Sequence, residues 1–232
     1  MYIIITGTST GLGRALAEEF TTYNHRVLGI SRRQTIHAPN YQHISLDLTD
    51  DHAVDKLSFD IPVDENRVLL INNAGQINPI NKTAALHPSE LAEHYRLNVW
   101  AVHSLCALFL RQTNSDQQRH IINISSGAGK YPVPGWSAYC AGKAAVDALS
   151  SVIAKEYDDI RIWSLAPGIV DTPMQSTIRN TPEDKFPEQK RFLDYHRNGE
   201  LSAPTDIAKA IVTLIDNPEK VTEVIVSLRD LA

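Results

Sequence analysis

The chain of 232 residues contains little cysteine and carries no excess of positive charge. Its two cysteines, Cys106 and Cys140, both fall in predicted helices and offer no disulfide framework. A formal net charge of -5 gives no electrostatic reason to expect binding to nucleic acid or to an anionic membrane. The longest apolar stretch, Val99 to Leu110, is interrupted by polar residues and is too short to span a bilayer.

A targeting segment and internal repeats are also missing from the sequence. Strand-like residues begin at Tyr2, which leaves no room for a signal or transit peptide, so a soluble cytoplasmic protein is expected. The proportions of 43% hydrophobic and 21% charged residues are ordinary for a globular protein. Because no linker or low-complexity tract divides the chain, we predict a single domain over residues 1–232. No metal site is predicted.

Short apolar runs alternate with helical stretches along the chain. The strands predicted from these runs lie at 2–5, 26–30, 42–46, 68–71, 121–124, 161–165 and 224–226. The predicted helices lie at 14–20, 50–59, 89–112, 138–156 and 205–216. The link between Arg33 and Gln42 is short and contains a proline, so a loop is expected there in place of a crossover helix.

A glycine-containing turn follows the first predicted strand and leads directly into a helix. The turn reads Thr6-Gly7-Thr8-Ser9-Thr10-Gly11-Leu12-Gly13. Its glycines allow backbone amides to approach a pyrophosphate, and the helix N-terminus favours negative charge. The Gly-x-x-x-Gly-x-Gly spacing differs from the G-x-G-x-x-G fingerprint, and an ordinary loop is the alternative for this motif alone.

Acidic residues are absent from the region between Phe20 and Leu46. An NAD-binding crossover unit normally places an acid there to hold the ribose 2′-hydroxyl. Arg32 and Arg33 stand in its place, after Ser31 at the end of the second strand, and a guanidinium suits a 2′-phosphate. We therefore predict NADP(H) as the cofactor, with a merely solvated strand end as the alternative.

A tyrosine and a lysine four residues apart, Tyr139 and Lys143, begin the helix predicted at 138–156. Residues four apart share a helix face, so the phenol and the ammonium point the same way. The spacing alone occurs by chance in many helices. Its meaning depends on whether the rest of the chain builds a site around the pair.

Residues 175–201 interrupt the alternation with prolines, charges and the aromatics Phe186, Phe192 and Tyr195. A long irregular insertion of this kind is often a lid or a binding loop, so we predict a substrate lid here. The pocket walls expected beside it are Tyr131, Val133, Trp136 and Met174. Aromatic walls favour an aromatic or planar carbonyl compound, and the alternative is that these rings pack the lid or an interface.

Taken in order, these motifs resemble those of the short-chain dehydrogenase/reductase (SDR) family over nearly the whole chain. The resemblance is carried by Gly7, Gly11, Gly13, Asp47, Asn72-Asn73-Ala74-Gly75, Asn98, Ser126, Tyr139, Lys143, Pro167, Gly168 and Thr172. It implies an α/β fold with a Rossmann-type, doubly wound parallel sheet of about seven strands and helices on both faces. The strand end Gly29-Ile30-Ser31-Arg32 is most similar to sepiapterin reductase-like and benzil reductase-like bacterial members.

The resemblance also implies a catalytic tetrad of Asn98, Ser126, Tyr139 and Lys143. A carbonyl that accepts hydride develops negative charge on oxygen, so it needs a proton donor and an oriented polar neighbour. In the family pattern Tyr139 is the donor and Lys143 lowers its pKa. Ser126 bonds the substrate oxygen, and Asn98 anchors a water that relays protons. Ser125 is the competing serine, but Ser126 lies 13 residues before Tyr139, the usual family interval.

For the cofactor, the resemblance places NADP(H) over the glycine turn and the strand ends. The implied contacts are Gly7, Ser9, Thr10, Gly11, Leu12, Gly13, Ser31, Arg32, Arg33, Asp47, Leu48, Asn73, Ala74, Gly75, Tyr139, Lys143, Pro167, Gly168, Val170 and Thr172. Many NADP-binding members carry a basic residue where this chain has Thr10. The preference for NADP(H) therefore rests on Arg32 and Arg33.

The implied function is NADPH-dependent reduction of a ketone or diketone, such as an aromatic diketone or a pterin with a keto side chain. A 3-oxoacyl-thioester reductase or an alcohol dehydrogenase on the same tetrad is the alternative. A non-catalytic NADP(H)-binding sensor is a more remote one. The expected partner is a small-molecule carbonyl substrate. A homodimer or homotetramer is expected through the helices over 99–110 and 138–156.

Overall fold

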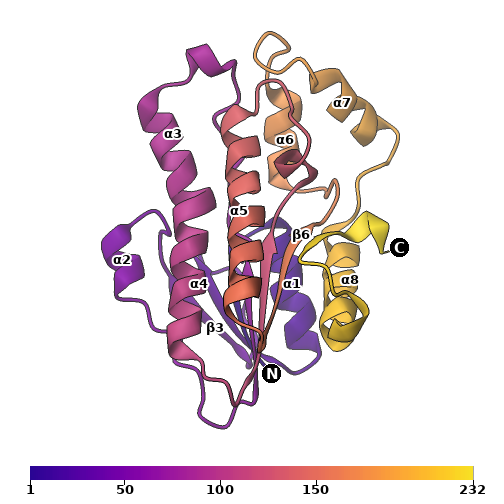
Figure 1. Ribbon diagram of the computed structural model, residues 1–232. Coiled ribbons are helices and arrows are strands. Elements are labelled where there is room, and N and C mark those ends of the chain that lie inside the picture. Colours follow the sequence, from indigo (N-terminus) through magenta and orange to yellow (C-terminus); the bar gives the residue numbers. More distant parts are fainter. Residues whose placement is uncertain (232) are drawn as a thin grey trace.

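Isoleucine, leucine and valine fill the central strands, which are buried on both faces. The computed structural model describes residues 1–231, and its strands form one sheet in the order β3-β2-β1-β4-β5-β6-β7 (Figure 1). The strands are β1 (Tyr2–Thr6), β2 (Arg26–Ser31), β3 (Tyr41–Ser45), β4 (Arg67–Asn72), β5 (Gln118–Ile124), β6 (Ile160–Ala166) and β7 (Ile225–Ser227). All neighbouring pairs are parallel, which confirms the predicted fold class.

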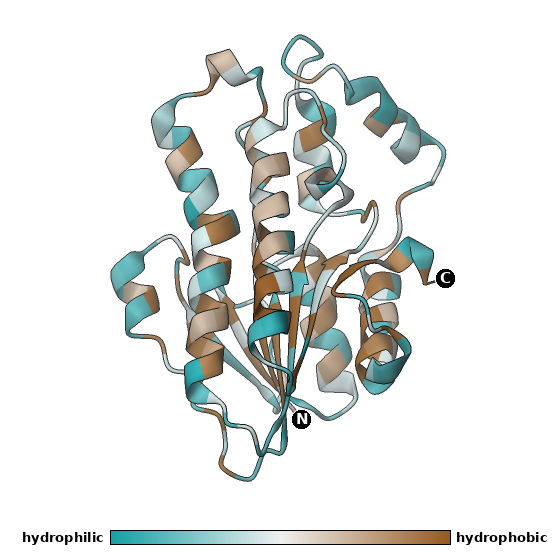
Figure 2. Cartoon of the chain, viewed as in Figure 1, coloured by the Kyte–Doolittle hydropathy of each residue, from teal (hydrophilic) through white to brown (hydrophobic). Residues whose placement is uncertain are grey.

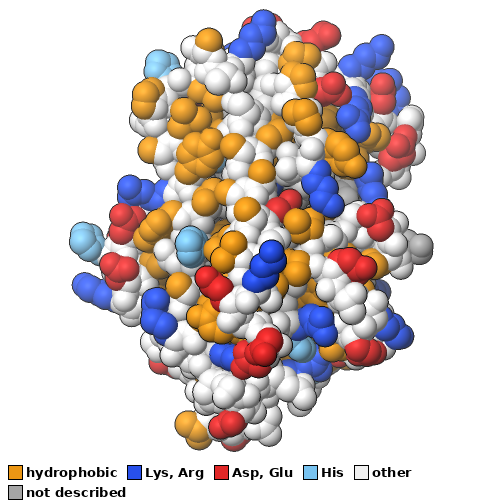
Figure 3. Space-filling view, in the orientation of Figure 1, with side chains coloured by type: hydrophobic (Ala, Val, Ile, Leu, Met, Phe, Trp, Pro, Cys, Tyr) orange, Lys and Arg blue, Asp and Glu red, His pale blue; other side chains and the backbone are white. Residues whose placement is uncertain are grey.

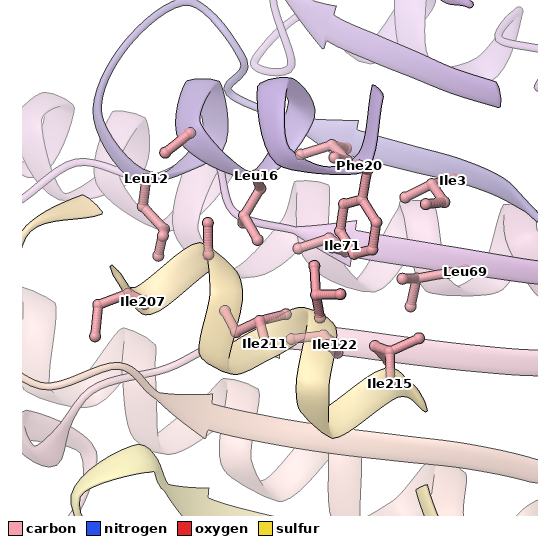
Figure 4. Packing of buried hydrophobic residues seen from close by; sticks show 14 of the residues in the cluster. Ile3, Leu12, Leu16, Phe20, Leu69, Ile71, Ile122, Ile207, Ile211 and Ile215 are labelled. Carbon is pink, nitrogen blue, oxygen red and sulfur yellow. The ribbon is translucent and has the colours of Figure 1, made fainter. Parts of the chain in front are cut away.

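Helices cover both faces of this sheet (Figure 1). One face carries α1 (Gly11–Thr22) and α8 (Pro204–Asp216), and the other carries α4 (Ala101–Gln112) and α5 (Ser137–Glu156). Figure 4 shows Leu16 of α1 and Ile211 of α8 meeting over the sheet, where both side chains are fully buried. The shorter elements are α2 (Asp51–Asp55) and the 3-10 turns Thr83–Ala85, Gly127–Gly129, Pro218–Lys220 and Leu228–Asp230.

The connections place the site at one edge of the sheet. The chain moves outward from β1 to β3 and then returns to β4 on the other side of β1, so the strand order reverses between β1 and β4. The link from β2 to β3 contains no helix, as predicted. Thr6, at the end of β1, accepts the Asn73 and Ala74 amides on its hydroxyl at 3.0 and 2.9 Å. These bonds tie the glycine turn to the end of β4.

The long helix predicted at 89–112 is continuous, but it changes geometry in the middle. It consists of α3 (Pro88–Tyr95), a π-helical turn over Arg96–Trp100, and α4. The periodicity of the sequence did not predict the π-helical turn. Such wide turns inside α-helices occur frequently at functional sites, and this one holds Asn98.

The segment predicted to be irregular over 175–201 is largely helical, which corrects that part of the prediction. It forms α6 (Pro173–Asn180) and α7 (Gln189–Arg197). The prolines that suggested an irregular segment, Pro182 and Pro187, lie in the link between the two helices and interrupt neither of them. Figure 2 shows α7 as mostly hydrophilic, and its inward side chain, Phe192, is buried.

Candidate active site

A cleft of about 1170 Å³ opens at the carboxyl edge of the sheet. Its walls come from the segments that follow β1 to β6, together with α5 and α6, at the point where strand order reverses. The predicted site residues that line it are Gly7, Ser9, Thr10, Gly11, Leu12, Ser31, Arg32, Asp47, Leu48, Asn73, Ala74, Gly75, Ser126, Tyr131, Trp136, Tyr139, Lys143, Pro167, Gly168, Val170, Thr172 and Met174. Gly13, Arg33 and Asn98 lie outside the cleft wall.

The glycine turn is shaped by close backbone contacts. Gly7 has a φ of 75°, and a Cβ atom there would lie 2.9 Å from the Ala74 Cα atom. A Cβ atom on Gly13 would lie 2.3 Å from the Gly7 carbonyl oxygen. Gly13 therefore allows close packing of α1 on the turn, and it does not line the cleft wall.

The N-terminus of α1 points its amides at the same turn. Thr10 precedes the helix but makes no side-chain capping bond, so the first-turn amides are not capped by it. The Thr35 hydroxyl donates to the Ser9 carbonyl at 3.2 Å and holds the turn from outside. Uncapped amides, the positive end of the helix dipole and room for a close approach fit a pyrophosphate group.

The two arginines after β2 differ in position. Arg32 lines the cleft, and within residues 1–231 its guanidinium forms no ion pair. Both arginines are exposed, and Arg33 does not line the cleft wall. Ser31 is buried, and its hydroxyl donates to the Arg33 carbonyl at 2.9 Å and contacts His43 Nε2 at 3.1 Å. Arg32 is therefore the arginine after β2 whose side chain borders the cleft, where it could contact a phosphate.

Asp47 and Leu48 border the cleft after β3. The pKa of Asp47 lies below its ordinary value because the Thr49 amide donates to its carboxylate at 3.0 Å. The Thr49 hydroxyl donates to the same oxygen at 2.8 Å. Asp47 is exposed while Leu48 is buried, so a polar acceptor and an apolar surface lie side by side.

Asn98 is buried behind the cleft in the π-helical turn and clamps the segment after β4. Its Nδ2 donates to the Gln76 carbonyl at 2.7 Å, and its Oδ1 accepts the Gln76 amide at 2.9 Å. A second Nδ2 bond reaches His94 Nε2 at 2.9 Å. His94 Nδ1 lies 2.6 Å from the Asn78 carbonyl oxygen, which places the proton on Nδ1 and leaves Nε2 as the acceptor.

His94 is a residue that the sequence patterns did not single out. It is fully buried, and burial is the main cause that lowers its pKa, with the Lys143 charge acting in the same direction. A neutral histidine therefore stands behind the predicted tetrad, with its ring edge-on to Tyr139 at 6.3 Å between ring centroids. Its spacing of four residues from Asn98 was the available signal, because that spacing places both on one helix face.

Tyr139 and Lys143 occupy one face of α5, as their spacing predicts. The Lys143 Nζ atom lies 5.6 Å from the Tyr139 ring centroid and donates to the Ile124 carbonyl at 2.7 Å. Both side chains are buried, at 8% and 7% exposed. The pair therefore lies at the floor of the cleft beside the end of β5.

Burial dominates the pKa values of this pair. It raises the pKa of Tyr139 to about 12, and interaction with the Ser126 hydroxyl acts in the opposite direction. Burial also lowers the pKa of Lys143 to about 8, and the charge of Asp147 opposes that change. Desolvation of the phenol therefore sets the direction of the Tyr139 pKa, and the group that opposes it is Ser126.

The two candidate serines have different hydrogen-bond partners. Ser125 is buried, and its hydroxyl donates to Asp147 Oδ1 at 2.6 Å. Ser126 is only partly buried, accepts the Ala128 amide at 3.2 Å, and lowers the pKa of the neighbouring Tyr139 phenol. The hydroxyl of Ser126 is therefore the one that adjoins the phenol in the cleft.

The loop after β6 closes the inner end of the cleft. Gly168 has a φ of 86°, and a Cβ atom there would lie 3.1 Å from Arg229 Nε. Thr172 precedes α6, and its methyl group would lie 3.1 Å from a Cβ atom on Gly11. The C-terminal residues Ser227, Arg229 and Asp230 also line the cleft, and no motif in the sequence indicated them.

Aromatic rings from the start of α5, from the link between α6 and α7, and from α7 form one cluster above the cleft. Trp136 is buried and stacks on Phe186 with ring centroids 4.9 Å apart and an interplanar angle of 6°. Phe192 lies 5.3 Å from Trp136, and Tyr139 lies 5.6 Å from it. Trp136 therefore packs the α6–α7 segment while also lining the cleft. Tyr131 is 71% exposed at the rim.

Comparison with known proteins gives consistent matches. The family model described as short chain dehydrogenase matches residues 1–183. A benzil reductase ((S)-benzoin forming) from Bacillus cereus is 37% identical over 237 residues, covering 94% of this chain and 95% of the relative. A sepiapterin reductase from Rattus norvegicus is 32% identical over 240 residues, covering 91% of this chain and 90% of the relative.

Among solved structures, the crystal structure of the KRED1-Pglu enzyme has a TM-score of 0.81 and 28% identity. It covers 92% of this chain and 93% of its own. Within residues 1–231, no helix combines the length and apolar character needed to cross a membrane. The strand order, the cleft at its switch point and these matches together place the chain in the short-chain dehydrogenase/reductase family of oxidoreductases.

Proposed function

We propose that this oxidoreductase is an NADPH-dependent carbonyl reductase that acts on ketones or diketones. The observation that carries the proposal is the convergence of Ser126, Tyr139 and Lys143 at the floor of a dinucleotide-sized cleft. The cofactor, when bound, supplies the hydride. The side chains then have to stabilise the developing oxyanion and deliver a proton to it.

The residues of the cleft fit a phosphorylated dinucleotide. The turn around Gly7 lines the cleft while packing closely on Ala74, and the α1 amides face this turn without a side-chain cap from Thr10. Arg32 stands at the position of the missing acid, and among residues 1–231 its guanidinium has no ion-pair partner. Asp47 and the turn over 73–75 would border the adenosine side, and the loop over 167–172 the nicotinamide side.

Tyr139 is the proton donor in this proposal. Its pKa of about 12 keeps the phenol protonated at neutral pH, so the phenol has a proton to donate when the carbonyl is reduced. Ser126 orients the substrate oxygen, and Lys143 holds the ribose and supplies positive charge beside the phenol. Asn98, fixed by Gln76 and His94, anchors the water that relays protons to Lys143.

We propose an aromatic or planar carbonyl substrate, with a diketone preferred over a pterin carrying a keto side chain. The relative named as a benzil reductase matches over most of both chains, and the cleft is roofed by stacked aromatic rings. We also propose that α6, α7 and the link between them act as the substrate lid, because Phe186 of the link and Phe192 of α7 are buried against Trp136, which contacts Tyr139.

The alternatives differ in the molecule that the cleft accepts. A 3-oxoacyl-thioester reductase or an alcohol dehydrogenase would use the same tetrad, and relative rates on diketone, pterin, acyl-thioester and alcohol substrates separate these activities. A non-catalytic NADP(H) sensor would bind the cofactor and reduce no carbonyl in such a panel. Retention of Asn98, Ser126, Tyr139 and Lys143 favours an enzyme.

We further propose a homodimer or homotetramer through α4 and α5. The solvent face of α5 carries Ala141, Ala144, Ala148 and Val152, and no charged residue lies among them. An open groove of about 880 Å³ runs beside α4, lined by Val99, Trp100 and Ala107 among others. Figure 3 shows apolar side chains gathered over this side of the molecule.

The test of the proposed activity is the variant Tyr139→Phe. We expect carbonyl reduction, followed by NADPH absorbance on a diketone panel, to fall by about 10²–10⁴-fold because the general acid is lost. NADPH binding, followed by fluorescence, should stay within about twofold of the parent protein.

The matched control is Tyr131→Phe, which removes the hydroxyl of an exposed tyrosine in the same cleft. It should retain activity near that of the parent protein. Near-normal rates in Tyr139→Phe would rule out the proposed proton donor.

A further inference from the structure

A buried carboxylate lies one helical turn beyond Lys143, and the proposed reaction does not use it. Asp147 is 7% exposed, the same fraction as Lys143, and it follows Lys143 by four residues on α5. Residues four apart share a helix face, so the ammonium and the carboxylate lie on one side of α5. Both line the same cleft.

Two serines, one after β5 and one in β6, hold the Asp147 carboxylate in place. Ser125, after β5, donates to Oδ1 at 2.6 Å, and Ser164 in β6 donates to the same atom at 2.5 Å. A Cβ atom on Gly129 would lie only 2.8 Å from Asp147 Oδ2. The carboxylate therefore fills the space that a side chain at position 129 would occupy. The position of the carboxylate is therefore fixed by hydrogen bonds and by close packing.

The buried carboxylate has no ion-pair partner in direct contact within residues 1–231. Burying a lone charge is costly, which implies compensation by a nearby group of opposite sign. The cation on the same face is Lys143, whose pKa burial lowers to about 8 while the Asp147 charge acts to raise it. The other groups facing Lys143 are Tyr139 and, from α3, His94, whose pKa is lowered chiefly by burial and further by the Lys143 charge.

We propose that Asp147 is a positioning residue whose buried negative charge keeps the Lys143 ammonium protonated and fixed beside Tyr139. Ser125 and Ser164 serve this arrangement by holding the carboxylate. Asp147 is the carboxylate that opposes the effect of desolvation on Lys143. Without it, Lys143 would lose its proton at a lower pH. The kinetic consequence of this inference rests on the proposed reductase function, whereas the titration of Lys143 does not.

The direct test is an NMR titration of the Lys143 side chain in the full chain, with isotope-labelled lysine, in the parent protein and in Asp147→Asn. The asparagine removes the charge but keeps the shape and one acceptor for the serines. We expect the Lys143 midpoint to fall by about one pH unit or more. Asp147→Ser removes the same charge with a smaller side chain and provides the same measurement if the asparagine variant does not fold.

The kinetic test follows kcat/KM for NADPH-linked carbonyl reduction against pH in the same variants. Because Lys143 must be charged, a lower pKa makes the rate fall at a lower pH. At a pH above both midpoints, the rate should drop about tenfold for every pH unit by which the Lys143 midpoint falls. Glu93→Gln is the control, since it removes an exposed carboxylate from the same cleft, where solvent screens the charge. Its alkaline limb should match that of the parent protein.

An unchanged Lys143 midpoint in a folded, charge-removed variant overturns the inference. An equal change of midpoint in Glu93→Gln also overturns it, because the effect would then be a general one of net charge. Absence of carbonyl reduction in the parent protein would count against the proposed function alone. The Lys143 titration would still decide the role of Asp147.

Discussion

Arg32 and Arg33 show how much one position matters at a strand end. The two side chains are identical in chemistry, yet only Arg32 lines the cleft. Both residues lie in the bend that follows β2, where the turn of the backbone gives neighbouring side chains different positions. The proposed preference for NADP(H) therefore rests on one guanidinium in the structure, where the sequence pointed to two.

For Arg32→Ala, we expect the Kd for NADPH to rise by about 10–100-fold, because a charge-assisted bond to a phosphate contributes about 1.5–3 kcal/mol. The Kd for NADH should change little, since that cofactor lacks the 2′-phosphate. Binding of both cofactors can be measured by fluorescence titration.

Arg33→Ala is the matched control, because it removes the same charge one residue away. Its NADPH affinity should stay within about threefold of the parent protein, a change typical of screened surface charges. Equal losses in the two variants would mean that overall charge, and not a specific phosphate contact, sets the preference.

Two helical elements carry features that local sequence patterns do not reveal. The π-helical turn at Arg96–Trp100 interrupts an otherwise regular helix at Asn98. The polar bonds of Asn98 to Gln76 and His94 come from tertiary contacts, and a helix with a uniform period would not position them in the same way. The segment over α6 and α7, the proposed lid, is likewise held by aromatic contacts of Phe186 and Phe192 to Trp136, at the start of α5.

Phe186→Ala tests the lid. The Phe186 ring is fully buried against Trp136, so its removal should lower the free energy of unfolding by about 3 kcal/mol and loosen α6 and α7. We expect the KM for an aromatic diketone to rise about tenfold, while the Kd for NADPH remains nearly unchanged. Thermal unfolding, steady-state kinetics and fluorescence titration measure the three quantities.

Leu193→Ala is the comparison on α7, because Leu193 is 37% exposed and lies outside the aromatic cluster. It should have little effect on KM. A Phe186→Ala variant that lost stability but kept its KM would show that the rings pack the fold without shaping the substrate site.

At the scale of the whole molecule, the sheet order brings distant residues into one cleft. The turn after β1, the end of β4 and the loop after β6 are separated in sequence but adjacent at the switch point between β1 and β4. The helices α4 and α5 cover one face of the sheet and leave an apolar side exposed (Figures 1 and 3). That exposed side is the basis of the proposed oligomer.

We expect light scattering at micromolar concentration to give a mass that is a multiple of the 25.8 kDa chain. Ala148→Lys places a charge on the exposed face of α5 and should move the protein toward the monomer, because burying an unpaired ammonium is costly. Ala210→Lys makes the same change on the exposed face of α8 and should leave the mass unaltered. A monomeric parent protein would contradict the proposal.

The sequence by itself determined the order and type of the main elements. Continuous apolar runs predict buried parallel strands, and apolar residues at helical spacing predict the covering helices, because burial imposes these periods locally. The loop between β2 and β3 and the shared face of Tyr139 and Lys143 also follow from short-range chemistry. The family motifs, read in order, were sufficient to identify the SDR family, which the comparisons confirm.

Only the tertiary structure decided which neighbours share a contact. It separated Arg32 from Arg33 and Ser125 from Ser126, turned an irregular stretch into two helices, and placed His94 and Asp147 around the tetrad. These outcomes depend on groups far apart in sequence, such as Ser164 and Asp147, that packing brings within hydrogen-bonding distance. Local periodicity carries no information about such pairs, because their geometry is set by the sheet order and by the competition for buried polar partners.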